Sequence, residues 1–142
     1  MSNTPNLALP YWDEGNAQPN LIVNAAWDIL DAAITDLEGG GAQMAQPTTN
    51  YTPVLGDQVV EMNVGSANEL TVPANGDVAF PLGWVLEVWQ MGAGQTQIVP
   101  DSGVTILYHA DDTLFLLGQN AGCSLRKVGT NTWRLVGKME AA

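Results

Sequence analysis

Charged residues are scarce in this sequence, and basic residues are absent from most of its length. Only 13% of the 142 residues are charged and the net charge is −11, whereas about a quarter of the residues in a typical soluble domain are charged. The four basic residues stand near the C-terminal end: Arg126, Lys127, Arg134 and Lys138. Binding to phosphate-rich surfaces needs a basic patch, so neither nucleic acid nor an anionic membrane is an expected partner.

Cysteine and long apolar runs are also in short supply. The single cysteine, Cys123, excludes an intrachain disulfide and a cysteine-based zinc site, and we expect it to be a small buried residue between strands. No stretch approaches the roughly 18 apolar residues of a membrane span. The first residues, MSNTPNLALP, lack the basic region of a signal peptide. The sequence therefore predicts a protein that is made in the cytoplasm and stays soluble until it assembles.

Groups that could perform catalysis are few. His109 is the only histidine, and nothing places Ser102 on a nucleophile elbow that would complete a triad with His109 and Asp111. Asp111 and Asp112 would face opposite ways in a strand and would be solvated in a turn, and a calcium contact with Asp101 is the weaker alternative. We therefore expect no enzymatic activity, no cofactor and no bound metal.

Apolar residues, in contrast, are plentiful. They make up 46% of the chain, which is too much for a disordered protein. A soluble monomer with this apolar content normally carries more surface charge. The composition therefore favours a protein whose surface is partly covered by copies of itself or by another protein.

Residues 1–38 are expected to form a docking arm followed by a helix. Prolines at three positions before residue 20 favour an extended conformation for residues 1–19. The apolar side chains of this stretch are predicted to dock on a neighbouring capsid protein: Leu7, Leu9, Tyr11 and Trp12. The alternative is that they pack on the C-terminal domain of their own chain.

The only predicted helix spans residues 21–37. Its apolar residues follow the spacing of a helix seam: Val23, Trp27, Leu30, Ile34 and Leu37. A helix of about four turns is marginal alone in water, so it must pack on something. Three copies around an axis would bury this seam and form a trimer interface, and the alternative is packing against the β-domain of the same chain.

Residues 39–52, which begin with three glycines, are predicted to be a polar linker, and residues 53–142 a β-domain. Short strands separated by turn residues are typical of an antiparallel β-sandwich or barrel. The expected strands are 59–64, 70–73, 78–81, 85–90, 96–99, 104–108, 114–117, 124–128 and 133–136. Residues 92–95 are interpreted as a hairpin turn.

Both faces of these strands carry apolar residues. This favours strands that lie between a core and a contact with another subunit. The aromatic side chains of the domain are expected mainly in such packing, and a sugar-binding surface is the alternative for four of them: Trp84, Trp89, Trp133 and Tyr108.

Two stretches resemble surface proteins of tailed phages. Residues 4–36 resemble the short N-terminal segment of head-spike and fibre proteins from phages and gene transfer agents. The residues that match are Thr4, Pro5, Leu7, Leu9, Pro10, Gln18, Val23, Asn24, Ala25, Leu30, Asp31 and Ala32. The resemblance implies that this segment seats the protein on the particle.

The second stretch, residues 57–137, is similar to a β-module of phage head-decoration and tail-fibre proteins. It is recognised by Ala67-Asn68, Leu70-Thr71-Val72-Pro73, Val78-Ala79-Phe80-Pro81-Leu82-Gly83, Val88, Gln90, Gly92-Ala93-Gly94-Gln95, Gly103-Val104-Thr105-Ile106, Leu125, Lys127, Gly129-Thr130-Asn131-Thr132-Trp133, Leu135 and Gly137. The resemblance implies a trimeric, non-enzymatic protein on the outer surface of the virion.

Together these features predict a capsid decoration protein, either a cement protein or a short head spike, that is a homotrimer bound to the major capsid protein or another virion protein. No shaft separates the docking arm from the β-domain, which favours the head over the tail. The alternative is a tail-fibre tip or knob that binds a receptor or glycan on the host surface.

Overall fold

The computed structural model describes residues 28–30 and 42–142 and separates the chain into two units, residues 1–41 and residues 42–142. Residues 28–30 are helical, as predicted, and the Leu30 side chain is exposed. The other residues predicted to dock or to form the helix seam lie outside the described residues: Leu7, Leu9, Tyr11, Trp12, Val23, Trp27, Ile34 and Leu37. In the described part of the chain, no helix has the length and apolar character needed to cross a membrane.

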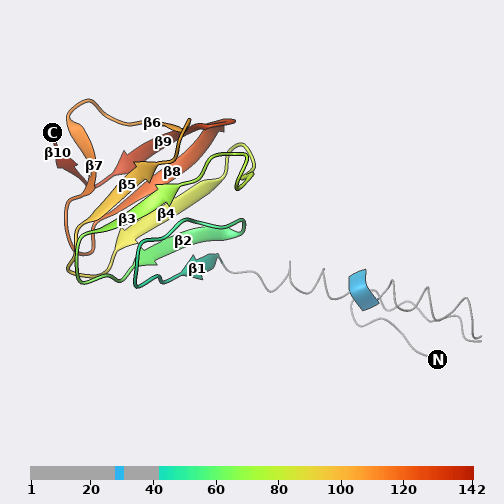
Figure 1. Ribbon diagram of the computed structural model, residues 1–142, viewed down its shortest axis with the longest axis horizontal. Coiled ribbons are helices and arrows are strands. Elements are labelled where there is room, and N and C mark those ends of the chain that lie inside the picture. The colour runs from blue at the N-terminus through green and yellow to red at the C-terminus, as the bar shows by residue number, and fades with distance from the viewer. Residues whose placement is uncertain (1–27, 31–41) are drawn as a thin grey trace, which may run out of the picture. The chain divides into compact units, whose positions relative to one another are not determined.

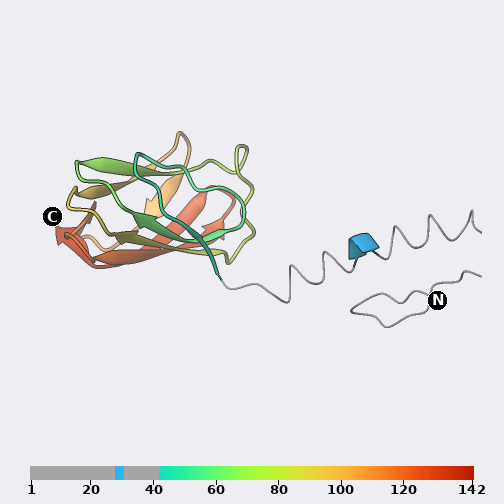
Figure 2. The ribbon, with the colours of Figure 1, turned by 90° about the horizontal axis from the view of Figure 1, so that it is seen from below.

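Residues 42–142 form two β-sheets, which are seen edge-on as two layers in Figure 2. The larger sheet has six strands in the order β1-β2-β4-β8-β9-β6. Its strands are β1 (Gln43–Ala45), β2 (Asp57–Met62), β4 (Val85–Gln90), β8 (Gly122–Gly129), β9 (Thr132–Gly137) and β6 (Thr105–Leu107). The smaller sheet has the order β10-β7-β5-β3, with β10 (Met139–Ala141), β7 (Asp112–Leu116), β5 (Thr96–Pro100) and β3 (Asn68–Val72). The prediction of a mainly β fold is confirmed.

Strand pairing is mixed and not antiparallel throughout. β2 pairs with β4 in the larger sheet, and β3 pairs with β5 in the smaller one, both in parallel. This follows from the connections, because the chain passes from β2 to β3 and from β4 to β5 by crossing between the sheets (Figure 1). We call each of these crossing connections an arch. Two arches that stack on each other place strands of the same direction side by side. Turn residues mark where a strand ends, but they do not tell whether the chain returns within one sheet or crosses to the other.

The interpretation of residues 92–95 as a hairpin turn is therefore wrong, because this segment is the arch between β4 and β5. It packs on the β2–β3 arch, where the N–H of Gly94 donates to the carbonyl of Val64 at 2.9 Å. A Cβ atom at Gly94 would lie 1.9 Å from the carbonyl oxygen of Ser66. Glycine is needed here because another backbone occupies the space of a side chain.

The described part of the predicted linker, residues 42–52, belongs to the β-domain. β1 pairs in parallel with β2, and Tyr51 forms a parallel bridge with Leu70 of β3. The Tyr51 hydroxyl donates to Asp57 Oδ2 at 2.8 Å, and burial next to this carboxylate raises the pKa of Tyr51 to about 12. Because this stretch is polar, it was predicted to be a linker, although it forms the first of three stacked arches.

Residues 78–81, predicted as a strand, form a loop without regular structure. Phe80 of this loop is buried in the core, and its ring packs edge-on against Trp133 with the centroids 5.6 Å apart. The apolar pattern thus predicted the burial of Phe80 correctly, although the backbone of residues 78–81 does not pair with a strand. Strand β10, which no prediction included, extends the chain beyond β9 into the smaller sheet.

The core of the β-domain lies between the two sheets. Its buried apolar residues are Val60, Met62, Val64, Leu70, Val72, Phe80, Leu86, Val88, Ile98, Ile106, Leu116, Ala121, Cys123, Leu125, Trp133, Leu135 and Met139. They alternate with exposed residues along the strands, as in β4, where Leu86 and Val88 face inward and Glu87 and Trp89 face outward. This period of two leaves one side of each sheet to be covered by something else or by water.

Candidate functional site

The outer face of the six-stranded sheet is the most distinctive surface of the β-domain. We use this name for the outward-facing residues of its strands: Met44, Val59, Glu61, Val85, Glu87, Trp89, Thr105, Leu107, Gly122, Ser124, Arg126, Val128, Thr132, Arg134 and Val136. Its apolar members include Met44, Trp89 and Val136, which are 56%, 38% and 64% exposed. Contiguous exposed apolar residues rimmed by polar ones mark interaction surfaces.

Two arginines face each other across the β8–β9 hairpin. The register pairs Arg126 with Arg134 directly, with Val85 and Leu107 as their outer neighbours in the same row. Within the described part of the chain, neither guanidinium has a carboxylate within 4.0 Å. Like charges directly opposite each other destabilise a strand pair. The two guanidinium groups are therefore available to an anionic partner.

Trp89 lies flat against the sheet on this face. Its register partner is Gly122, and a Cβ atom at Gly122 would lie only 2.6 Å from Cε3 of the indole. The indole N–H points to Glu87 Oε2 at 3.4 Å. A glycine opposite the tryptophan thus lowers the ring onto the strands, which keeps the outer face flat enough for another surface to lie on it.

Charge is divided between the two halves of the outer face. The half made by β1, β2 and β4 carries Glu61 and Glu87, and the half made by β8, β9 and β6 carries Arg126 and Arg134. Glu61 accepts a hydrogen bond from Gln46 Nε2 at 2.5 Å. The boundary between the acidic and the basic half falls at the centre of the sheet, between β4 and β8.

The outer face of the smaller sheet is mostly polar. The residues that point outward from it are Glu69, Thr71, Gln97, Val99, Thr113, Phe115 and Glu140, of which the two apolar ones, Val99 and Phe115, are partly buried. Gln95 Nε2 donates to Glu140 Oε2 at 2.8 Å, and the hydroxyl of Thr113 donates to the carbonyl of Glu140 at 3.0 Å. Such a face is satisfied by water and by its own hydrogen bonds.

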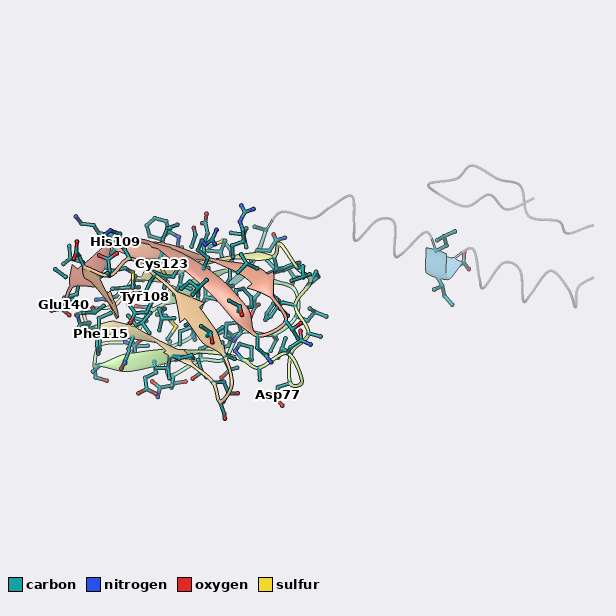
Figure 3. All side chains as sticks on the ribbon, turned by 90° about the horizontal axis from the view of Figure 1, so that it is seen from above. Asp77, Tyr108, His109, Phe115, Cys123 and Glu140 are labelled. Carbon is teal, nitrogen blue, oxygen red and sulfur yellow. The ribbon has the colours of Figure 1, made fainter. Side chains whose placement is uncertain are left out.

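A groove of about 430 Å³ borders the outer face at β9 and the segment that follows β6. It is lined by Tyr108, His109, Asp112 and Arg134, with an apolar floor that includes Val136. Tyr108 and His109 lie near one end of the domain, away from Asp77 at the other (Figure 3). An exposed aromatic ring beside a guanidinium and a carboxylate is a combination that suits a sugar.

The groups considered for catalysis do not form a triad. Ser102 lies in the turn before β6, where its N–H donates to Asp101 Oδ1 at 2.7 Å. His109 lies in the turn after β6 with its Nδ1 at 3.8 Å from Asp111 Oδ2, and both side chains are largely exposed. Among the residues that the structure describes, no three His, Cys, Asp or Glu side chains are grouped to hold a metal ion.

Cys123 is buried in the core, as predicted. Burial raises the pKa of its thiol to about 12, so the thiolate that would react is not formed at neutral pH.

The four aromatic residues considered for sugar binding do not form one surface. Trp133 is fully buried, and Trp84 packs against the core while its indole N–H donates to the carbonyl of Asp57 at 2.9 Å. Trp89 and Tyr108 are exposed, but β8 and β9 separate their strands. Only Tyr108 lines the groove.

Sequence reasoning missed the burial of Lys127. Its ammonium group donates to the carbonyl of Phe80 at 2.7 Å and to Asn75 Oδ1, and it ties the loop before β4 to β8. Removal from water lowers the pKa of this amine. The inward positions of Cys123 and Leu125 on the same strand were the signal, because the period of two places residue 127 on their side.

Comparisons with known proteins identify no relative: no family model, no curated protein and no solved structure matches this chain.

Proposed function

We propose that this protein is a bacteriophage capsid decoration protein, a cement protein or short head spike that docks as a homotrimer on the outside of the head. Its partners in this role are other copies of the chain and the major capsid protein or another virion protein. The protein acts by covering and joining subunits and performs no reaction.

The observation that carries the proposal is the apolar, charge-divided outer face of the six-stranded sheet. The core of the β-domain lies between the two sheets, and the exposed apolar residues of this face are not part of it. Their burial against another protein would contribute about 25 cal/mol per Å² of apolar surface removed from water. A domain with its own core and such a face is suited to assembly on a larger structure.

The sequence supplies the second support. The resemblance of residues 4–36 and 57–137 to phage head-decoration and fibre proteins remains a prediction, and it agrees with a compact β-domain carried behind a separate N-terminal unit. The low share of charged residues and the net charge of −11 also fit a protein on the outside of the particle, away from packaged DNA.

The test is binding of the purified full-length chain to particles that lack it. We expect the chain to co-sediment with the particles and to raise the temperature at which they release DNA. A variant that begins at Ala42 retains every core residue of the β-domain, and it should fold but bind the particles much more weakly. No co-sedimentation of the full-length chain would contradict the proposal.

A second function, binding of a host glycan by a fibre tip or knob, is favoured by the groove beside β9. The groove combines Tyr108 with Arg134, and this guanidinium has no carboxylate partner in the described part of the chain. A carboxylated sugar would place its ring on the tyrosine and its carboxylate on the arginine. Binding to acidic glycans on an array that is lost in Arg134→Ala would support this function over decoration, and binding to no glycan would remove it.

A further inference from the structure

The exposed basic residues of this chain are confined to one region of the β-domain. Arg126 and Arg134 lie on the outer face of the six-stranded sheet, and Lys138 directly follows β9. The fourth basic residue, Lys127, is buried. In a chain with a net charge of −11, an attractive contact between a Lys or Arg side chain of one copy and a carboxylate of another therefore involves this region, because the chain has no other Lys or Arg.

The acidic partners for such a contact are on the same face. Glu61 and Glu87 lie on the outer face across the β4–β8 boundary from the arginines. When the acidic half of one copy's outer face meets the basic half of the next copy's outer face, opposite charges lie over each other and the other half of each face is left for a third copy. The apolar residues between the charges, Trp89 and Val136 among them, are covered in the same contact.

We propose that the outer face of the six-stranded sheet is the surface through which copies of this chain bind each other, with Glu61 and Glu87 of one copy paired to Arg126 and Arg134 of the next. In a homotrimer each copy offers its acidic half to one neighbour and its basic half to the other, so the ring closes with all halves paired. The inference rests on the self-association that the proposed function includes, and it assigns that association to the β-domain.

This pairing explains two features that the isolated domain leaves unexplained. The two facing arginines gain carboxylates that desolvated guanidinium groups need. The flat position of Trp89 over Gly122 lets the neighbouring sheet approach closely. Complementary charges of this kind set the register and choice of partner more than they set affinity.

The test uses two full-length variants with opposite changes. Arg126→Glu with Arg134→Glu makes the outer face acidic throughout, and Glu61→Lys with Glu87→Lys makes it basic throughout. Juxtaposed like charges cost several kcal/mol, so each variant alone should self-associate about 100-fold more weakly than the unmodified chain. In a mixture of the two, two of the three contacts of each mixed trimer join opposite charges, so the mixture should assemble more strongly than either variant alone, and native mass spectrometry should show that each assembly contains both variants.

The matched control reverses two acidic residues away from the outer face, Glu69→Lys with Asp77→Lys, which changes the net charge by the same amount as the basic variant. It should assemble as the unmodified chain does. Circular dichroism checks that each variant is folded. If either reversal prevents folding, the neutral pair Arg126→Gln with Arg134→Gln provides the comparison and should also weaken association.

The possible outcomes separate this inference from the proposed function. Variants that assemble normally by themselves would overturn the assigned surface, while binding of the unmodified chain to particles would still support decoration. Variants that fail alone and also fail when mixed would overturn the pairing of acidic with basic halves. An unmodified chain that stays monomeric at micromolar concentration would overturn the inference and the homotrimer together.

Discussion

The two sheets of the β-domain share one core but present different outer faces to the surroundings. The four-stranded sheet shows polar side chains that bond to each other, such as Gln95 with Glu140. The six-stranded sheet shows Trp89 and Val136, and it has two facing arginines without a carboxylate partner in the described part of the chain. Six of the twelve large apolar side chains that are exposed on the β-domain lie on this one face, where a partner can cover them together: Met44, Val85, Trp89, Leu107, Val128 and Val136.

The largest expected effect is on stability. It comes from a substitution that disturbs the stacking of the arches, which connect the two sheets. Gly94→Ala places a Cβ atom 1.9 Å from the backbone of Ser66, and backbone cannot move aside without separating the β2–β3 and β4–β5 connections. We expect a loss of about 3 kcal/mol in the free energy of unfolding, measured by urea denaturation. Gly65→Ala, which meets nothing within 4 Å, is the control and should stay within about 0.5 kcal/mol of the unmodified chain.

The next effect distinguishes the two faces directly. Val136→Asp puts a carboxylate into the apolar part of the outer face, where the parent side chain is 64% exposed. Folding should be unaffected because the site is exposed in the monomer, but self-association should weaken by about 100-fold, since burying an unpaired charge is costly. Leu117→Asp, at a position 50% exposed that follows β7 in the smaller sheet, should leave the sedimentation coefficient unchanged. Equal effects of the two substitutions would erase the distinction between the faces.

A smaller effect is expected at Lys127, and the control is its neighbour Arg126, which lies on the opposite side of strand β8. Lys127 faces the core, and its pKa is lowered from the ordinary value of 10.5. The unfolded chain therefore holds this proton to higher pH than the folded chain, so the free energy of unfolding rises with pH from the folded pKa of Lys127 up to the ordinary value of 10.5. Lys127→Met should remove this rise, and Arg126→Gln on the outer side should keep it.

The pKa of Cys123 is shifted in the opposite direction, so this thiol lowers the free energy of unfolding at high pH, where Lys127 raises it. Its pKa is raised from 9.0 to about 12, so its contribution to stability is complete below pH 9.0 and is lost as the pH increases toward 12. The Lys127 comparison is therefore made as a difference between variants, or in a Cys123→Ala background. A pH profile of Lys127→Met identical to that of the unmodified chain would contradict the buried, desolvated amine.

The smallest effect is expected on the polar face. Glu140→Gln keeps a group that can accept from Gln95, at an exposed position. The free energy of unfolding should change by less than about 0.5 kcal/mol, and the assembled mass should not change. Native mass spectrometry that showed dissociation would indicate that the smaller sheet also carries a contact between copies.

Much of the fold can be predicted from the sequence, because the alternation of residues along each strand shows which side of that strand is buried. The alternation of Leu86 and Val88 with Glu87 and Trp89 predicted strand β4 and its two apolar faces correctly. The parallel pairing of β2 with β4 did not follow, because it depends on which turns cross between the sheets. Gly92 and Gly94 were recognised as turn residues, yet only the stacked backbones show why they must be glycine.

The candidate site was predicted in part. Two apolar faces were expected, but the facing of Arg126 and Arg134 depends on the register of the β8–β9 hairpin. The turn Gly129-Thr130-Asn131 fixes that register, and the charge pairing could have been drawn from it. The division of Glu61 and Glu87 from the arginines needs the order of strands in the sheet, which no local pattern contains.

The most direct test of a covered outer face is hydroxyl-radical footprinting of the full-length chain at concentrations where it is assembled and where it is dissociated. We predict that oxidation of Trp89 and Met44 falls several-fold on assembly, while oxidation of Phe115 on the smaller sheet stays the same. Equal oxidation of Trp89 in both states, in a chain shown to be assembled, would mean that copies meet elsewhere and would contradict a covered outer face.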